Sequence, residues 1–234
     1  MKGSSPVLRR LITVSAAVLG VGLVATGCSP VKFGAAATVG SHRITLAALN
    51  TEVTNLSRNV QQYHNPSSLT AVQQTQDTLT WLIRFQINEQ LARAQGITVS
   101  TAQAQTALAQ IDAEAKSELA SEGVSNASLN FILSYIGIPP NLASEVGRYQ
   151  AIDTQYIKQV NGGQVPTATA AQTATTAKLT RAQCLAAKTL QIQVNPQFGR
   201  LNYTQYEVVS VPATVTRAEG PAKAASTAGL TPAC

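Results

Sequence analysis

Apolar residues recur at helical spacing through most of residues 45–160, and short extended segments flank this region on both sides. The strongest pattern predicts a helix over residues 68–95, whose main apolar face carries Val72, Leu79, Ile83 and Ile87. Trp81 and Phe85 lie on a different face of the same helix. An apolar surface of this width predicts a central helix that contacts its neighbours on several sides.

Start and stop signals divide the rest of the region into further helices. Thr45 is placed as the N-cap of a helix over residues 45–63, and Ser100 with Gln103 forms a capping box at the start of another. Gly96 is placed to close the central helix. The remaining helices are predicted over residues 100–122, 126–136, 141–160 and 178–188.

Extended segments lie at both ends of the helical region. Residues 36–39 and 42–44 flank a Gly-Ser turn, and residues 189–194 and 206–211 have the patterns of strands near the other end. Terminal strands of a helical domain often pair with each other, and we expect such pairing here. The predicted fold class is therefore mainly α, with several helices and a small β element formed by N-terminal and C-terminal strands.

The first 27 residues have the pattern of a secretory signal peptide. A basic region ends at Arg10, an apolar run covers residues 11–24, and small residues lead directly into Cys28. This ending resembles a bacterial lipobox, which implies that Cys28 is acylated and becomes the new N-terminus. Two alternatives stay open: a plain signal peptide with an incidental cysteine, and a membrane span. A span needs roughly 20 apolar residues, and the run supplies about 16. Export is expected by the general secretory route, because the residues around the paired arginines match a twin-arginine signal poorly.

The composition divides the remaining chain into three parts. They are a tether over residues 28–35, a helical domain over 36–211, and an Ala-, Pro- and Thr-rich tail over 212–234 that is predicted to be disordered. Within the domain, residues 164–177 are low in complexity. They are interpreted as a linker or as the weak start of the helix that follows.

Cysteine is sparse, with Cys184 and Cys234 as the two residues besides Cys28. Because an exported chain meets an oxidising compartment, these two form a candidate disulfide. Charge is also modest. The net charge of the whole chain is +6, and three of its basic residues fall in the predicted signal peptide. The small basic excess that remains gives no support to nucleic-acid binding.

The sequence has no catalytic or metal-binding pattern. His42 and His64 are the only histidines, and no nucleophile elbow accompanies Ser41-His42. Three glutamates at four-residue spacing, Glu114, Glu118 and Glu122, are more typical of a solvated helix face than of acid–base chemistry. No ligand cluster or phosphate-binding loop occurs. The sequence therefore implies no catalytic residue, no metal and no cofactor.

Large aromatic side chains are the remaining candidates for a functional surface. A binding surface for unfolded chains would use them, because burial of apolar area is non-directional. The alternative is that they fill the core, and Trp81 and Phe85 are favoured as surface residues because they lie off the main apolar face. The candidates are Trp81, Phe85, Phe131, Tyr135, Tyr149 and Tyr156.

Several segments resemble SurA and PrsA-type foldases. Residues 39–46 (Val-Gly-Ser-His-Arg-Ile-Thr-Leu) look like the strand–turn–strand–helix opening of that family, and residues 96–100 (Gly-Ile-Thr-Val-Ser) look like the exit of its second helix. Residues 194–199 (Val-Asn-Pro-Gln-Phe-Gly) resemble the closing segment of SurA-like lipoproteins of actinobacteria. The resemblance covers roughly residues 36–211 and implies a SurA N-terminal-like chaperone domain.

One departure from the family bears on activity. Many relatives carry a parvulin prolyl-isomerase domain before the closing segment, and such a domain needs on the order of 90 residues. Here residues 161–188 are the interval available, and they lack a globular strand pattern. The resemblance therefore implies a chaperone without isomerase activity.

These inferences give a holdase on the outer face of the cytoplasmic membrane, anchored through Cys28 and binding unfolded exported polypeptides. A structural or adaptor lipoprotein that binds one envelope partner is the alternative. A hydrolase or isomerase is the weakest interpretation. The sequence leaves the client and the oligomeric state open.

Overall fold

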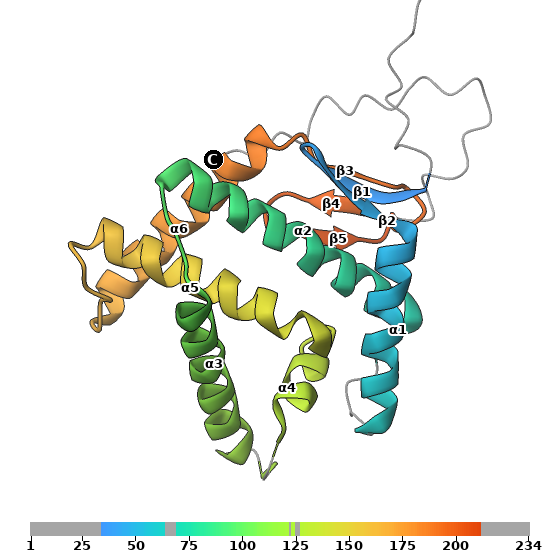
Figure 1. The fold of residues 1–234 in the computed structure, drawn as a ribbon, viewed down its shortest axis with the longest axis horizontal. Helices are drawn as coiled ribbons and strands as arrows, with labels where there is room; N and C mark the ends of the chain where they lie inside the picture. Colours follow the sequence, from blue (N-terminus) through green and yellow to red (C-terminus); the bar gives the residue numbers. More distant parts are fainter. Residues whose placement is uncertain (1–33, 64–68, 122, 125–126, 212–234) are drawn as a thin grey trace, which may run out of the picture. The chain divides into compact units, whose positions relative to one another are not determined.

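The computed structural model describes residues 34–63, 69–121, 123–124 and 127–211, all of which belong to the compact unit Val31–Cys234. The predicted signal peptide and the C-terminal tail lie outside the described residues. The elements in chain order are β1 (Ala35–Val39), β2 (His42–Thr45), α1 (Leu46–Gln62), α2 (Ala71–Gln95), α3 (Thr101–Ser121), α4 (Leu129–Tyr135), a 3₁₀ turn (Pro140–Leu142), α5 (Ala143–Val160), α6 (Thr169–Thr189), β3 (Gln193–Val194), β4 (Arg200–Asn202) and β5 (Glu207–Val209) (Figure 1).

The N-terminal hairpin forms as the sequence predicts. Gly40 adopts a left-handed φ of 61° at the turn, which a glycine tolerates without strain, and β1 and β2 pair on either side of it. Thr45 then caps α1, because its side-chain oxygen accepts a hydrogen bond from the amide of Ala48 at 3.1 Å. The strand therefore passes directly into the first helix.

Strands from the two ends of the chain pair with each other, which confirms the predicted fold class. The order of the first sheet is β2-β1-β3, and both contacts of β1 are antiparallel. Ala37 lies opposite Val194. The side-chain amide of Asn195 donates to the carbonyl of Ala35 at 3.2 Å, 160 residues earlier in the chain. The helical region is thus enclosed between two paired ends.

The strand predicted over residues 189–194 is wrong for most of its length. Helix α6 continues to Thr189, Gln191 adopts a left-handed φ of 42°, and the strand covers Gln193–Val194 alone. The alternation of apolar residues reflects burial all the same, since Leu190 and Ile192 are both buried. A helix end followed by one left-handed residue brings both side chains into the core.

A second small sheet follows, and one of its strands is missing from the sequence prediction. β4 pairs antiparallel with β5, and the strand predicted over residues 206–211 shortens to Glu207–Val209. The hydroxyl oxygen of Thr80 on α2 accepts a hydrogen bond from the amide of Val208 at 2.8 Å. This hairpin is therefore tied directly to the central helix.

The low-complexity segment is mostly helical. The linker interpretation of residues 164–177 fails from Thr169 onward, where α6 begins, and the alternative of a helix start applies. Thr175 is buried, and its hydroxyl oxygen accepts a hydrogen bond from the side-chain amide of Asn161 at 3.0 Å. This contact joins the first turns of α6 to the end of α5, although the Ala/Thr composition by itself specifies little.

Helix α2 contacts α1, α5, α6, β1 and β5, as its wide apolar surface predicts. Its ends are well defined. Thr70 and Gln73 form a capping box, and Gly96 closes the helix in the left-handed conformation. Because it borders both the terminal strands and the later helices, α2 joins the two halves of the core.

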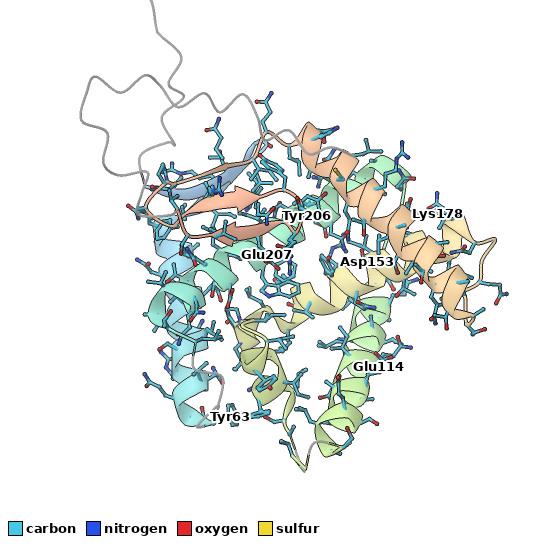
Figure 2. All side chains as sticks on the ribbon, turned by 180° about the vertical axis from the view of Figure 1, so that it is seen from behind. Tyr63, Glu114, Asp153, Lys178, Tyr206 and Glu207 are labelled. Atoms are coloured by element: carbon cyan, nitrogen blue, oxygen red, sulfur yellow. The ribbon has the colours of Figure 1, made fainter. Side chains whose placement is uncertain are left out.

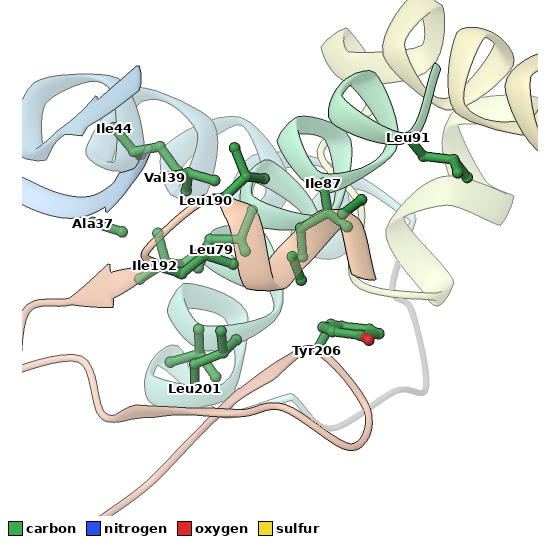
Figure 3. Close-up of a cluster of buried hydrophobic side chains, with 14 of the residues drawn as sticks. Ala37, Val39, Ile44, Leu79, Ile87, Leu91, Leu190, Ile192, Leu201 and Tyr206 are labelled. Carbon is green, nitrogen blue, oxygen red and sulfur yellow. The ribbon is translucent and has the colours of Figure 1, made fainter. Parts of the chain in front are cut away.

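The core has one large cluster and two smaller ones. The large cluster gathers side chains from β1, β2, α1, α2, α5, α6 and the C-terminal hairpin, and Figure 3 shows part of it around Leu79 and Ile192. A second cluster centres on Phe85, Leu133 and Val146, where α2, α4 and α5 meet. No helix among the described residues is long and apolar enough to cross a membrane.

Helices α3 and α5 approach closely because α5 carries a glycine at the contact. A Cβ atom on Gly147 would overlap the backbone carbonyl oxygen of Ala104 and press on the side chain of Leu108. Neither a backbone atom nor a neighbouring helix can give way cheaply. The absence of a side chain at Gly147 thus sets the distance between these helices.

We expect Gly147→Ala to lower the free energy of unfolding by roughly 1–3 kcal/mol, because the helices must separate to admit the methyl group. Thermal denaturation followed by circular dichroism would measure the loss. Gln159→Ala, an exposed change on the same helix, is the matched control and should stay within about 0.5 kcal/mol of the parent. Equal stability of the two variants would contradict the proposed overlap.

Candidate functional site

Four of the six predicted aromatic residues are packed where the helices meet. Trp81, Phe85 and Tyr149 form a triangle with ring centroids 5.9, 6.0 and 6.1 Å apart. Phe85 is buried, and Trp81 and Tyr149 are half-buried beside it. Tyr156 is buried in the large core cluster. These residues stabilise the junction of α2, α5 and α6.

The other two candidates lie at the surface. Phe131 and Tyr135 stack on each other along α4, with ring centroids 6.0 Å apart. Tyr63, at the end of α1, meets Phe131 edge-on at 6.0 Å. Tyr135 is 41% exposed and the next residue, Ile136, is 50% exposed. We call Tyr63, Phe131, Tyr135 and Ile136 the α4 aromatic surface, and Figure 2 shows Tyr63 at its edge.

A groove runs along α6 on another part of the domain. It encloses about 790 Å³ between α6 and the turn that joins β4 to β5. Threonines line much of its α6 side, together with Arg181 and Cys184, while Tyr203 and Tyr206 line the side formed by the turn. We call it the α6 groove. Its walls combine methyl groups, hydroxyl groups and aromatic rings with a single charged side chain.

The turn opposite α6 is held in a strained conformation. Tyr206 has a φ of 53°, in the left-handed region that favours glycine, yet its side chain is buried in the core cluster (Figure 3). The hydroxyl of Tyr203 donates to the carbonyl of Ile192 at 3.2 Å. Burial raises the pKa of both tyrosines, so both stay neutral at physiological pH. Burial of Tyr206 offsets the backbone strain and fixes this wall of the groove.

Arg84 anchors the same turn to α2. Its guanidinium donates to the carbonyl of Gln205 at 2.9 Å and pairs with the carboxylate of Glu207 at 3.0 Å. The same group lies 5.0 Å from the centre of the Trp81 ring, within range of a cation–π contact. Arg84 therefore links the aromatic triangle to the hairpin.

A buried carboxyl group lies where α2, α5 and α6 meet. The side-chain amide of Gln183 donates to Asp153 and to the Tyr149 hydroxyl, both at 3.3 Å. Burial raises the pKa of Asp153 from 3.8 to about 7, and hydrogen bonds from Asn88 and Gln183 oppose the rise (Figure 2). Burial, followed by the charge of Asp153, raises the pKa of Tyr149 to about 12. Asp153 thus takes up a proton as the pH falls through neutrality.

This proton makes stability depend on pH. The folded state holds it more tightly than the unfolded chain, so the contribution of Asp153 is complete below pH 3.8 and is lost as the pH rises through about 7. The difference between the two pKa values corresponds to roughly 4 kcal/mol at most.

We expect Asp153→Asn to flatten the fall in the free energy of unfolding between pH 4 and pH 8, because the amide carries no charge to bury. Denaturant titrations across that range would measure it. Glu114→Gln removes an exposed carboxylate and serves as the control, which should follow the parent chain. A parent slope retained in Asp153→Asn would show that Asp153 does not titrate in this way.

Among the residues that the structure describes, no group of three or more His, Cys, Asp and Glu side chains could hold a metal ion. His42 is exposed on β2, while His64 lies outside the described residues. Cys184 is buried on α6 and is disulfide-bonded. Cys28 and Cys234 also lie outside the described residues, so acylation of Cys28 and the pairing of Cys184 with Cys234 stay predictions.

The sequence analysis did not find Tyr63, Tyr203 or Tyr206 as surface or groove residues. Only the fold brings Tyr63 beside α4, across a break in the helical pattern. One signal was available for the groove. Threonines at positions 169, 173, 176 and 180 recur at helical spacing, and all four line the α6 groove. The low-complexity composition of the segment hides that period.

A helical domain closed by its own terminal strands, with an exposed aromatic surface and a long groove, has the features of a binding module. Residues 6–119 match the family model described as the SurA-like N-terminal domain, which confirms the predicted resemblance. The chain therefore carries a SurA-like N-terminal domain, a non-catalytic domain of a chaperone-type family. No curated protein and no solved structure matches the chain. The matched range ends within α3, so α4 and the α6 groove lie beyond it.

Proposed function

We propose that this protein is a lipid-anchored extracytoplasmic holdase, which binds unfolded exported polypeptides and has no prolyl-isomerase activity. The match to the SurA-like N-terminal domain carries the proposal, since that domain belongs to a chaperone-type family. The interval where relatives insert an isomerase domain holds a loop and the single helix α6, which supports the absence of that activity. A rate of prolyl-peptide isomerisation above background would contradict this part.

The α4 aromatic surface is the proposed contact site for clients. Phe131 and Tyr135 are the two predicted aromatic residues that this proposal retains, with Tyr63 and Ile136 beside them. Burying roughly 200 Å² of apolar area would contribute about 5 kcal/mol before the entropy of binding is subtracted. Such contacts are weak, reversible and indifferent to sequence, which suits a chain that must release its clients.

Two side chains of this surface can be removed with little effect on the fold, because Tyr135 and Ile136 are 41% and 50% exposed. We expect the double variant Tyr135→Ser, Ile136→Ser to bind an unfolded polypeptide at least tenfold more weakly, a loss of about 1.4 kcal/mol. Fluorescence anisotropy with a carboxymethylated polypeptide that cannot refold would measure the dissociation constant. A turbidity assay with a heat-denatured client would report the loss of aggregation suppression.

Val165→Ser is the matched control, because Val165 is also 50% exposed but lies in the loop before α6. It should bind the polypeptide as the parent does. Equal affinity of all three proteins would remove the α4 aromatic surface from the proposal. Failure of the parent itself to bind unfolded chains would remove the holdase activity, and a single stoichiometric envelope partner in a crosslinking pull-down would favour an adaptor instead.

The proposed anchor rests on the residues that precede Cys28, and acyl chains on that cysteine would hold the protein at the outer face of the cytoplasmic membrane. We expect Cys28→Ser to move the protein from the membrane fraction to the soluble fraction when cells are fractionated. Mass spectrometry of the parent should show the acyl mass on an N-terminal Cys28. An unmodified Cys28, or unchanged fractionation of the variant, would reject the anchor.

A further inference from the structure

The α6 groove contains a cysteine that already has a partner. Cys184 lines the groove, is buried, and is disulfide-bonded. The sequence has three cysteines, and the other two are Cys28 and Cys234. Within a single chain, the disulfide therefore brings one of these two residues to the groove.

The chain after β5 has ample length to return to the groove. Tyr206 lines the groove, and Val211, five residues further on, is the last described residue. The 23 residues that follow end at Cys234. A segment of that length spans up to about 75 Å when extended, whereas the return from Val211 to Tyr206 needs only roughly 17 Å.

The groove and the end of the chain are also chemically matched. The α6 side carries no charged side chain between Thr169 and Ala177, and residues 224–234 carry none either. Arg181 lies three residues before Cys184, lines the groove, and pairs with no side chain among the described residues. The backbone carboxylate of Cys234, as the last residue of this sequence, would bring a negative charge to it.

We propose that the α6 groove is the seat of the chain's own C-terminal segment, residues 224–234, held there by a Cys184–Cys234 disulfide and by attraction between Arg181 and the terminal carboxylate. Acylation of Cys28, which is part of the proposed function, would leave Cys234 as the available partner. The occupant does not depend on client binding, because the α4 aromatic surface lies on other elements. In this arrangement the segment joins α6 to the C-terminal hairpin.

The disulfide is tested on the full mature chain, purified in detergent without reductant. Trypsin should release residues 182–188 joined to residues 224–234, which mass spectrometry would detect as one species. Dithiothreitol should split it, with two electrons and two protons converting the disulfide into two thiols. Linkage of Cys184 to residues 28–32, or to a second molecule of the chain, would overturn the proposal whether or not the protein binds clients.

Occupation of the groove is tested by filling it. Thr176 and Ala174 are both exposed on α6, but only Thr176 lines the groove. We expect Thr176→Trp to lower the equilibrium constant for the Cys184–Cys234 disulfide in glutathione buffers at least tenfold, while Ala174→Trp leaves it unchanged. Equal constants for the two variants would mean that the segment is linked to Cys184 without lying in the groove.

The charge contact has its own pair of variants. Arg181→Gln should lower the same equilibrium constant about two- to fivefold, and Arg181→Lys should restore most of it, because a surface ion pair depends on the charge. Lys188→Gln removes a positive charge from the same helix outside the groove and is the control. The Arg181 effect should disappear in about 1 M salt. Identical behaviour of Arg181→Gln and Lys188→Gln would reject the carboxylate contact.

Discussion

Pairing of the first strand with a strand near the other end of the chain determines how the rest of the domain is arranged. β1 is the middle strand of its sheet, with β2 on one side and β3 on the other. The side chains beneath it, from Val39 and Ile44 to Leu190 and Ile192, belong to a single cluster together with α2. Without β3, one edge of β1 would be unpaired and this cluster would be open to water. The helices between the two strands can then form functional surfaces that the closure itself does not require.

The aromatic residues show how burial and binding divide within such a domain. Trp81, Phe85 and Tyr149 fill the junction of three helices, close to Arg84 and to the buried carboxyl of Asp153. Phe131 and Tyr135 stand on the short helix α4, which has few neighbours to cover them. An aromatic ring on a long central helix is therefore core, whereas the same ring on a short peripheral helix stays available for contacts with other chains.

Sequence patterns predict the elements that have strong local signals. The capping boxes at Thr70 and Ser100, the turn at Gly40 and the left-handed end at Gly96 fix helix and strand limits within a few residues. Patterns fail where distant contacts decide. The strand expected at residues 189–194 gave way to a longer helix, and the position of Tyr63 beside Phe131 depends on the packing of α1 against α4. The α6 groove is missed for the same reason, because its two walls are about 20 residues apart in sequence and meet only after folding.

The hydrogen bond between Asn195 and Ala35 has a further consequence, which concerns the nascent chain. The two residues are 160 positions apart, and synthesis proceeds at about 5–20 residues per second, so β1 waits roughly 10 to 30 s before β3 exists. Throughout that interval the ribosome holds a helical intermediate with one sheet edge unpaired. Such a chain stays loose enough to be threaded through a narrow channel, and it becomes a closed domain only after its last strands have emerged.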